Sequence, residues 1–129
     1  DTIFGEHEAL IARVPQLLDS TQLAISEGRV HPMVLAARFH GFFEYLHPFR
    51  DGNGRIGRLF SNFILHKAGH PIVIIRQENN GEYIHALRCI RTERTDEHLI
   101  AFFFRMAIER MQREMEEKKS GTKLMSFLF

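Results

Sequence analysis

Most of the side chains that could do chemistry lie in one segment near the middle of the chain. It reads His47-Pro48-Phe49-Arg50-Asp51-Gly52-Asn53-Gly54-Arg55-Ile56-Gly57-Arg58. Gly52 and Gly54 flank Asn53, so the backbone can adopt positive φ angles and approach a ligand without obstruction by side chains. The loop leads into a predicted helix, whose first N–H groups and positive dipole end favour an anion. The segment therefore predicts a phosphate-binding site.

Charged side chains in the same segment suit a polyphosphate. Arg55 and Arg58 are three residues apart on the first helical turn, where their charge opposes the helix dipole. Phosphates would supply the missing partner, because each guanidinium can bind two oxygens and stays charged at any working pH. Asp51 would hold Mg²⁺ that bridges phosphate oxygens. His47 is the evident general base of this segment, and Phe49 is expected to anchor the loop in the core.

Eight specified residues of this segment spell HxFx[DE]GNGRxxR, and by these residues the chain resembles the Fic family. The flanking sequences HPMVLAARFHGFFEYL and LFSNFILHKAGHPIVII are similar to the family's helices around that motif. The resemblance implies an all-α, Fic-type helical bundle with a short β-hairpin, the flap, near the N-terminus. It also implies an enzyme that transfers AMP from ATP, with Mg²⁺, to a Ser, Thr or Tyr hydroxyl of a target protein and releases pyrophosphate.

The resemblance implies a role for each matching residue. His47 would take the proton of the target hydroxyl, Phe49 would anchor the loop, and Asp51 would hold Mg²⁺ on the α- and β-phosphates. Outside the motif, Tyr83 would lie near the adenine. The phosphate-binding residues would be Gly52, Asn53, Gly54, Arg55 and Arg58, with Arg58 near the γ-phosphate. The returning strand of the flap would be Thr2, Ile3 and Phe4.

Two family features are missing from the sequence. Many Fic proteins carry an inhibitory helix of pattern [ST]xxxE[GN]; Thr2 and Glu6 have the spacing, but His7 replaces the small residue. The inhibitory glutamate is therefore expected either upstream or on another chain, unless this protein lacks one. Association of the chain into a homo-oligomer also stays open. Some relatives also place Asn eight residues after the adenine-proximal Tyr, where this chain has Arg91.

Three other functions stay open on the same residues. The phosphate cradle does not choose the base, so transfer of UMP, or of phosphocholine from a cytidine nucleotide, is an alternative. A kinase-like relative transfers a phosphoryl group but has lysine in place of the second loop glycine, and Gly54 argues against that. A non-catalytic nucleotide-binding interaction module would be expected to lose His47 or an arginine, and both are kept.

The elements that must position this segment are predicted to be helices. Pro15, Pro32 and Pro48 mark two helix starts and a helix end. The predicted helices span about 15–27, 32–47, 53–69, 81–93 and 96–118. Their expected inward residues include Leu59, Phe60, Phe63 and Ile64, and further along Ile84, Leu87 and Ile90. Ser120 and Gly121 are expected to break the last helix, leaving KLMSFLF as a packed segment or a docking surface.

Composition limits the remaining classes. The 129 residues form one expected domain, excised from a longer chain, and the net charge of +1 argues against a nucleic-acid partner. No run approaches the roughly 18 apolar residues of a membrane span. The single cysteine, Cys89, cannot form an internal disulfide, and no zinc motif can be assembled around it. A cytoplasmic location without a membrane partner is therefore expected.

Overall fold

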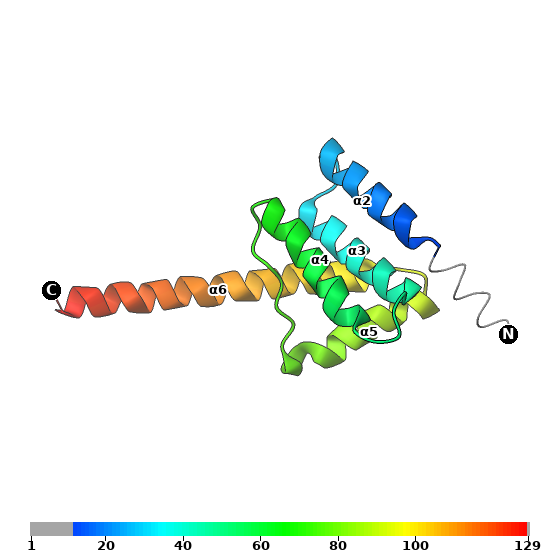
Figure 1. Cartoon of the computed structure of the whole chain (residues 1–129). Coiled ribbons are helices and arrows are strands. Elements are labelled where there is room, and N and C mark those ends of the chain that lie inside the picture. Colours follow the sequence, from blue (N-terminus) through cyan, green and yellow to red (C-terminus); the bar gives the residue numbers. More distant parts are fainter. Residues whose placement is uncertain (1–11, 129) are drawn as a thin grey trace.

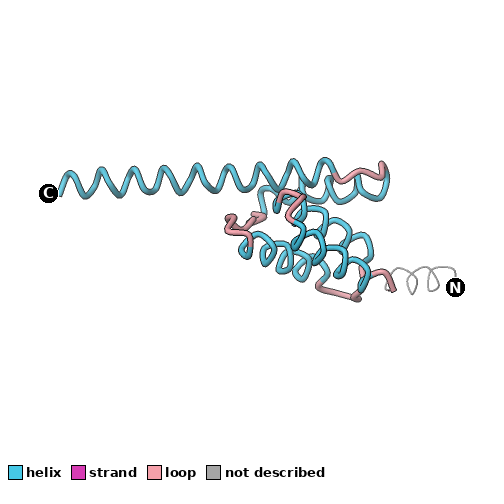
Figure 2. Tube along the Cα trace, turned by 90° about the horizontal axis from the view of Figure 1, so that it is seen from above, coloured by secondary structure: helices cyan, strands magenta, loops and turns pink. Residues whose placement is uncertain are grey.

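The computed structural model describes residues 12–128, with the side chains of residues 12–121, and this part of the chain is helical and contains no strand. The elements are α2 (Val14–Glu27), α3 (Pro32–Leu46), α4 (Asn53–Lys67), the short 3₁₀ helix η1 (Gln77–Asn79), α5 (Asn80–Thr92) and α6 (Glu97–Leu128). Figures 1 and 2 show a helical bundle from which the C-terminal part of α6 projects. The all-α prediction is confirmed. The predicted flap residues Thr2, Ile3 and Phe4 lie outside the described residues.

Helix ends follow the local signals in the sequence. Pro32 opens α3, and the Nδ1 atom of His31 accepts a hydrogen bond from the backbone N–H of Met33 at 3.1 Å. This side-chain cap satisfies one of the N–H groups that a helix start leaves unpaired. α2 ends at Gly28, whose φ of 65° is easy only for glycine. The predicted starts and ends of α2 and α3 are therefore confirmed to within about a residue or two.

Helix α3 lies at the centre of the bundle and packs against α2, α4, α5 and α6. Small side chains allow this, since a Cβ atom at Gly41 would lie 2.5 Å from Cδ1 of Ile90. The buried hydrophobic residues of α3 and α6 form most of the core: Met33, Ala36, Ala37, Phe39, Phe43, Leu46, Leu99, Phe102, Phe103, Met106 and Ala107.

The inward face of α4 differs from the predicted one. Leu59, Phe60 and Phe63 were expected inside but are 69%, 42% and 59% exposed. The residues at the crossing with α3 are Gly57 and Ser61, and the Ser61 hydroxyl donates to the carbonyls of Ala36 and Gly57 at 3.1 and 2.7 Å. The two backbones are too close for large side chains between them, so periodicity of large apolar residues pointed to the wrong face.

Helix α5 shows a similar correction. Ile84 is exposed and Leu87 and Ile90 are only partly buried, whereas Tyr83, Ala86 and Cys89 form the buried face. Tyr83 can be buried here because its hydroxyl is within hydrogen-bond distance of the buried ring of His40.

Helix α6 is longer than predicted, because it passes through Ser120 and Gly121 and ends at Leu128. One glycine costs a helix only about 1 kcal/mol relative to alanine, and extension of an existing helix is favourable for the surrounding residues. The apolar run Pro71–Ile75 forms a loop, held where Asn62 bonds both backbone groups of Val73.

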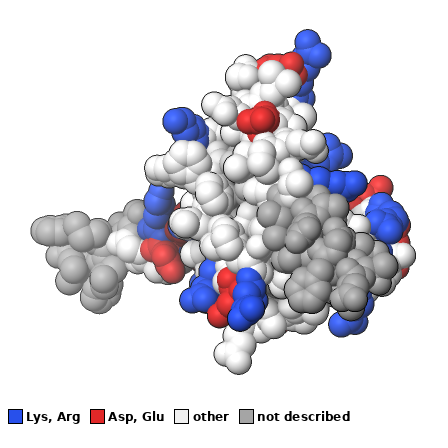
Figure 3. All heavy atoms as spheres, turned by 45° about the vertical axis from the view of Figure 1, so that its right-hand side comes forward, with Lys and Arg blue, Asp and Glu red and all other residues white. Residues whose placement is uncertain are grey.

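On the face that Figure 3 presents, Lys and Arg are scattered among Asp and Glu, in keeping with the net charge of +1. No helix of the described residues combines the length and the apolar character needed to cross a bilayer.

The crossing of α3 and α4 gives the first testable prediction. A Cβ atom at Gly57 would lie 2.9 Å from Nδ1 of the fully buried His40 ring, so Gly57→Ala should overpack this contact. We expect a loss of about 1–3 kcal/mol in the free energy of unfolding, measured by chemical denaturation.

Gly81→Ala is the matched control, because Gly81 is also in a helix and nothing lies within 4 Å of the added atom. It should leave stability unchanged or slightly raised. Equal stability of the Gly57→Ala variant and the unmodified chain would contradict the close approach of the two helices.

Candidate active site

The candidate site begins where α3 ends. His47 follows Leu46 as the C-cap with φ 48° and ψ 56°, a left-handed conformation that non-glycine residues adopt only at a cost. Its backbone N–H donates to the carbonyl of Phe43 at 3.0 Å, which holds this turn. The side chain is exposed and, together with Glu44, Arg88 and Arg91, lines a hollow of about 310 Å³ between α3 and α5. The imidazole is therefore available to a substrate.

Asn53 fixes the shape of the loop between α3 and α4. Its side-chain oxygen accepts from the N–H of Phe49 at 3.0 Å, and its amide nitrogen donates to the carbonyl of Phe49 at 2.6 Å. Asn53 itself is only 3% exposed. The side chain of Asn53 thus serves the loop, and the predicted phosphate contact from this residue falls to its backbone N–H.

The first turn of α4 presents free N–H groups. The helix begins after Gly52, which has φ 80°, and among the described residues no hydrogen bond engages the backbone N–H of Asn53, Gly54 or Arg55. The first turn contains no acidic residue, so the positive end of the helix dipole is uncompensated. This arrangement suits an anion and fits the predicted phosphate site.

Gly54 lies where three polar side chains meet. A Cβ atom there would be 3.0 Å from Oε1 of Glu44, 3.5 Å from Nη1 of Arg58 and 3.9 Å from the hydroxyl of Tyr83. Gly54 has an ordinary helical backbone, so glycine is required for room and not for its φ angle. The space that a side chain would fill is left to Glu44 and Arg58.

Glu44 is a site residue that the sequence analysis missed. Burial raises its pKa above the usual value, while the positive charges of His47, Arg58 and Arg91 act in the opposite direction. Glu44 is three residues before His47, one helical turn away on α3. That spacing was the signal that could have found it, because residues three apart on a helix face the same way.

Arg91 occupies the position where some relatives have asparagine, and it contacts the end of α3. Its Nη2 donates to the carbonyls of Glu44 and Tyr45, both at 3.2 Å, and its guanidinium lies 5.3 Å from the Tyr45 ring centroid. A cation at a helix C-terminus stabilises the unpaired carbonyls there.

Tyr83 and His40 form a buried pair behind the site. Nε2 of His40 and the hydroxyl of Tyr83 are 2.6 Å apart, and burial lowers the pKa of His40 to about 4. Burial also raises the pKa of Tyr83 to about 12, and the charge of Glu44 adds to the rise. Both groups are therefore neutral near pH 7. Tyr83 is only 3% exposed, and the guanidinium carbon of Arg58 lies 6.0 Å from the centroid of its ring. The contact of Tyr83 with adenine stays a prediction.

Phe49 is less buried than expected for an anchor. Its ring is 49% exposed and lies 6.3 Å from the Phe43 ring centroid. The backbone of Phe49, held at both ends by Asn53, does more to fix the loop than its ring does.

Asp51 has the environment that a Mg²⁺ ligand needs. It is exposed, one carboxylate oxygen accepts from the N–H of Gly52 at 2.7 Å, and the other has no hydrogen bond to the described residues. Magnesium is commonly held by one or two carboxylates together with substrate phosphates and water. The oriented carboxylate beside the free N–H groups of α4 fits such an ion.

A family comparison matches this part of the chain. The model of the Fic/DOC family covers residues 2–65, which include the whole segment from His47 to Arg58. Among curated proteins, the chain is 38% identical over 84 residues to "Protein adenylyltransferase Fic" of Drosophila grimshawi and 37% identical over 84 residues to the protein of that name from Drosophila melanogaster. These matches cover 65% of this chain but only 17% and 16% of the relatives.

Solved structures give the same relationship. A Fic domain containing signaling protein from Bacteroides thetaiotaomicron superposes with a TM-score of 0.75 at 29% identity, over 80% of this chain and 43% of that one. Fic-1 from C. elegans superposes with a TM-score of 0.70 at 26% identity, over 84% of this chain and 32% of that one. The chain therefore spans less than half the length of each protein that it resembles.

The paired hydrogen bonds of Asn53 give the second prediction, and Asn62 supplies a matched control. Asn62 bonds the N–H and carbonyl of Val73 as Asn53 bonds those of Phe49. Asn53→Ala and Asn62→Ala should each lower the free energy of unfolding by about 1–3 kcal/mol, because each leaves two backbone groups without their partner.

Only Asn53→Ala should also weaken ATP binding, because only Asn53 sets the loop at the start of α4. Isothermal titration calorimetry would show a dissociation constant raised by about tenfold or more for this variant, with that of Asn62→Ala unchanged. Equal ATP affinities of the two variants would remove the loop from the binding site.

Proposed function

We propose that this chain, which belongs to the Fic/DOC family, transfers AMP from ATP to a hydroxyl side chain of a target protein and releases pyrophosphate. The observation that carries the proposal is the place of Glu44, which lines the same hollow as the exposed imidazole of His47 and lies beside Gly54 in the first turn of α4. The backbone N–H groups of that turn are unpaired. The names of the curated relatives, protein adenylyltransferases, support the same reaction.

The phosphates would bind at the start of α4. The N–H groups of Asn53, Gly54 and Arg55 and the guanidinium groups of Arg55 and Arg58 are the donors that this chain offers to a triphosphate. Arg58 is half-buried beside Tyr83, so its guanidinium is partly ordered before any ligand binds. Positioning of this kind aligns the α-phosphorus and stabilises the charge that develops on the leaving group.

His47 would act as the general base. A ring nitrogen of His47 would accept the proton of the target hydroxyl while the oxygen of that hydroxyl forms a bond to the α-phosphorus. At the same time the bond between the α-phosphorus and the oxygen that bridges it to the β-phosphate would break, which releases pyrophosphate. Glu44 lines the same hollow as His47, and its carboxylate would stabilise the imidazolium that results. Mg²⁺, when bound at Asp51, would neutralise charge on the α- and β-phosphate oxygens.

Two partners belong to this proposal. The first is a target protein with an accessible Ser, Thr or Tyr hydroxyl. The second is an inhibitory helix, upstream in the sequence or on another chain, whose glutamate would pair with Arg58 and obstruct the γ-phosphate; a second copy of the chain is one possible source. An intracellular, cytoplasmic setting goes with an ATP-dependent transfer.

Labelled ATP distinguishes the reactions most directly. With ATP labelled at the α-phosphate, we expect label on protein, and with ATP labelled at the γ-phosphate, none. His47→Ala should abolish the α-label while ATP binding, measured by calorimetry, stays within about threefold. His66→Ala is the control, because His66 is an exposed histidine on α4 outside the segment from His47 to Arg58 and should keep full activity.

Other outcomes of this labelling experiment identify the alternatives. Label from the γ-phosphate would indicate phosphoryl transfer, and label from UTP or a cytidine-linked phosphocholine donor would indicate a different transferred group. ATP binding without any transfer would favour the non-catalytic module. Full activity of the His47→Ala variant would contradict the role of His47 as base.

Arg58 gives a prediction for binding alone. If its guanidinium binds the γ-phosphate, Arg58→Ala should weaken ATP binding by about 10- to 100-fold, because a charge-assisted contact contributes roughly 1.5–3 kcal/mol. ADP has no γ-phosphate, so its affinity should change much less. Calorimetry with both nucleotides tests this, with Arg29→Ala as an exposed arginine control; an equal loss for ATP and ADP would contradict the γ-phosphate role.

A further inference from the structure

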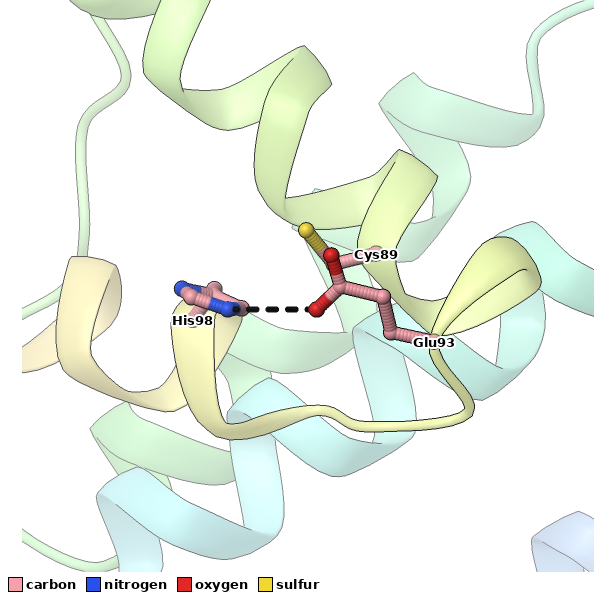
Figure 4. A group of neighbouring side chains, drawn as sticks. All are labelled: Cys89, Glu93 and His98. Carbon is pink, nitrogen blue, oxygen red and sulfur yellow. Dashed lines mark ion pairs between the residues drawn. The ribbon is translucent and has the colours of Figure 1, made fainter.

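Three potential metal ligands, Cys89, Glu93 and His98, meet where α5 turns into α6, and His85 lies next to one of them, Cys89. His85, Cys89 and Glu93 follow one another at four-residue spacing along α5 and its C-cap, so they lie on one side of the helix. His98 is in the first turn of α6. Figure 4 shows Cys89, Glu93 and His98 directed toward a common space between the two helices. The sequence analysis expected no zinc motif around Cys89, because this spacing matches none of the common patterns and depends on the turn between the helices.

Two of the separations between ligand atoms are close to those around a small tetrahedral ion. Ligand atoms of Cys89, Glu93 and His98 all lie within 4.8 Å of one another, and His85, which is outside this group, would turn toward the ion from its place beside Cys89. Oε2 of Glu93 is 3.7 Å from Nε2 of His98, and Sγ of Cys89 is 3.6 Å from Nε2 of His85. Around tetrahedral zinc, with bonds of about 2.0–2.3 Å, two ligand atoms are separated by about 3.3–3.8 Å.

The turn between the helices sets this geometry. Arg94 has φ 56°, a left-handed conformation immediately after Glu93, and reverses the chain direction. The Thr95 hydroxyl then accepts from the N–H of Glu97 at 3.3 Å at the start of α6. The guanidinium of Arg94 is directed elsewhere, since its Nη1 donates to the Tyr45 hydroxyl at 3.1 Å. The reversal brings His98 against Glu93 and adds no cation between them.

We propose that His85, Cys89, Glu93 and His98 bind a zinc ion that ties α5 to α6. One thiolate, two imidazoles and one carboxylate are ligands that Zn²⁺ accepts, and four protein ligands leave no open position, which indicates a structural ion. Binding would take the thiol proton of Cys89, release it to solvent and replace the Glu93–His98 contact. Asp51 is not among these residues, so the zinc site would be separate from the proposed Mg²⁺ site.

The consequence for the molecule is a fixed α5. This helix carries Tyr83, which packs against Phe102 of α6, and Arg91, which bonds the end of α3. An ion at the α5–α6 turn would hold both residues in place behind the candidate active site without touching a substrate.

The test uses the protein without a histidine tag, stripped with a chelator and dialysed. We expect one equivalent of Zn²⁺ per chain by equilibrium dialysis and a raised melting temperature on Zn²⁺ addition. Co²⁺ used as a probe should give a thiolate-to-cobalt charge-transfer band, and because Cys89 is the only cysteine that band assigns the ligand. The absence of both the band and the bound Zn²⁺ would overturn the proposal.

Variants connect the result to the residues. Cys89→Ser should abolish the band. His98→Asn should weaken Zn²⁺ binding by at least about tenfold, because losing a residue that only hydrogen-bonds a metal ligand already costs about that much. His98 is exposed, so His98→Asn should still fold, as circular dichroism would check. His66→Asn is the matched histidine control and should bind as the unmodified protein does. Unchanged Zn²⁺ affinity in both Cys89→Ser and His98→Asn would contradict the site.

Discussion

The close approach of α4 to α3 is the contact on which the rest of the site depends. Gly57 leaves no Cβ atom between the helices, where one would lie 2.9 Å from the His40 ring, and Ser61 bonds a carbonyl of each helix. The crossing places the start of α4 next to the end of α3. Only then can the short loop from His47 to Gly52 close, with Asn53 bonding both backbone groups of Phe49. Packing between small residues therefore determines where the polar atoms of the site lie.

Opposite ends of two helix dipoles meet at this loop. His47 lies at the C-terminus of α3, the end of that helix that carries partial negative charge. The free N–H groups lie at the N-terminus of α4, where partial positive charge favours phosphate. In the proposed reaction, the negative charge that develops on the leaving group would be stabilised by the backbone at the start of α4. Glu44, outside the motif, would then act on the imidazolium of His47.

Local signals predicted the helices, but the faces of the helices depended on tertiary contacts. Pro32, Pro48 and Gly28 fixed helix ends because each acts through its own backbone. The prediction of the buried face of α4 was right for Ile64, which is 6% exposed, and wrong for Leu59, Phe60 and Phe63. Toward the start of the helix that face consists of Gly57 and Ser61, which hydrophobic periodicity cannot distinguish from a polar face. The positions from His47 to Arg58 were found because glycines and charges interrupt a helical pattern. Glu44 was missed because a glutamate in a helix is ordinary until its neighbours are known.

The charge of the site shows why overall composition said so little about it. The chain has a net charge of only +1, yet Arg58 and Arg91 act on Glu44 at the junction of α3, α4 and α5, and Arg55 lies beside Gly52 in the adjoining loop. Glu44 of α3 lies beside Gly54 in the first turn of α4. An ionised carboxylate there would repel a phosphate bound at that turn, unless nearby positive charges offset it. Burial raises its pKa, and the cations around it offset its charge when it ionises. In the proposed complex, Arg55, Arg58 and the unpaired N–H groups of α4 would then offset the charge of a triphosphate, while Glu44 would offset part of the charge of Arg58.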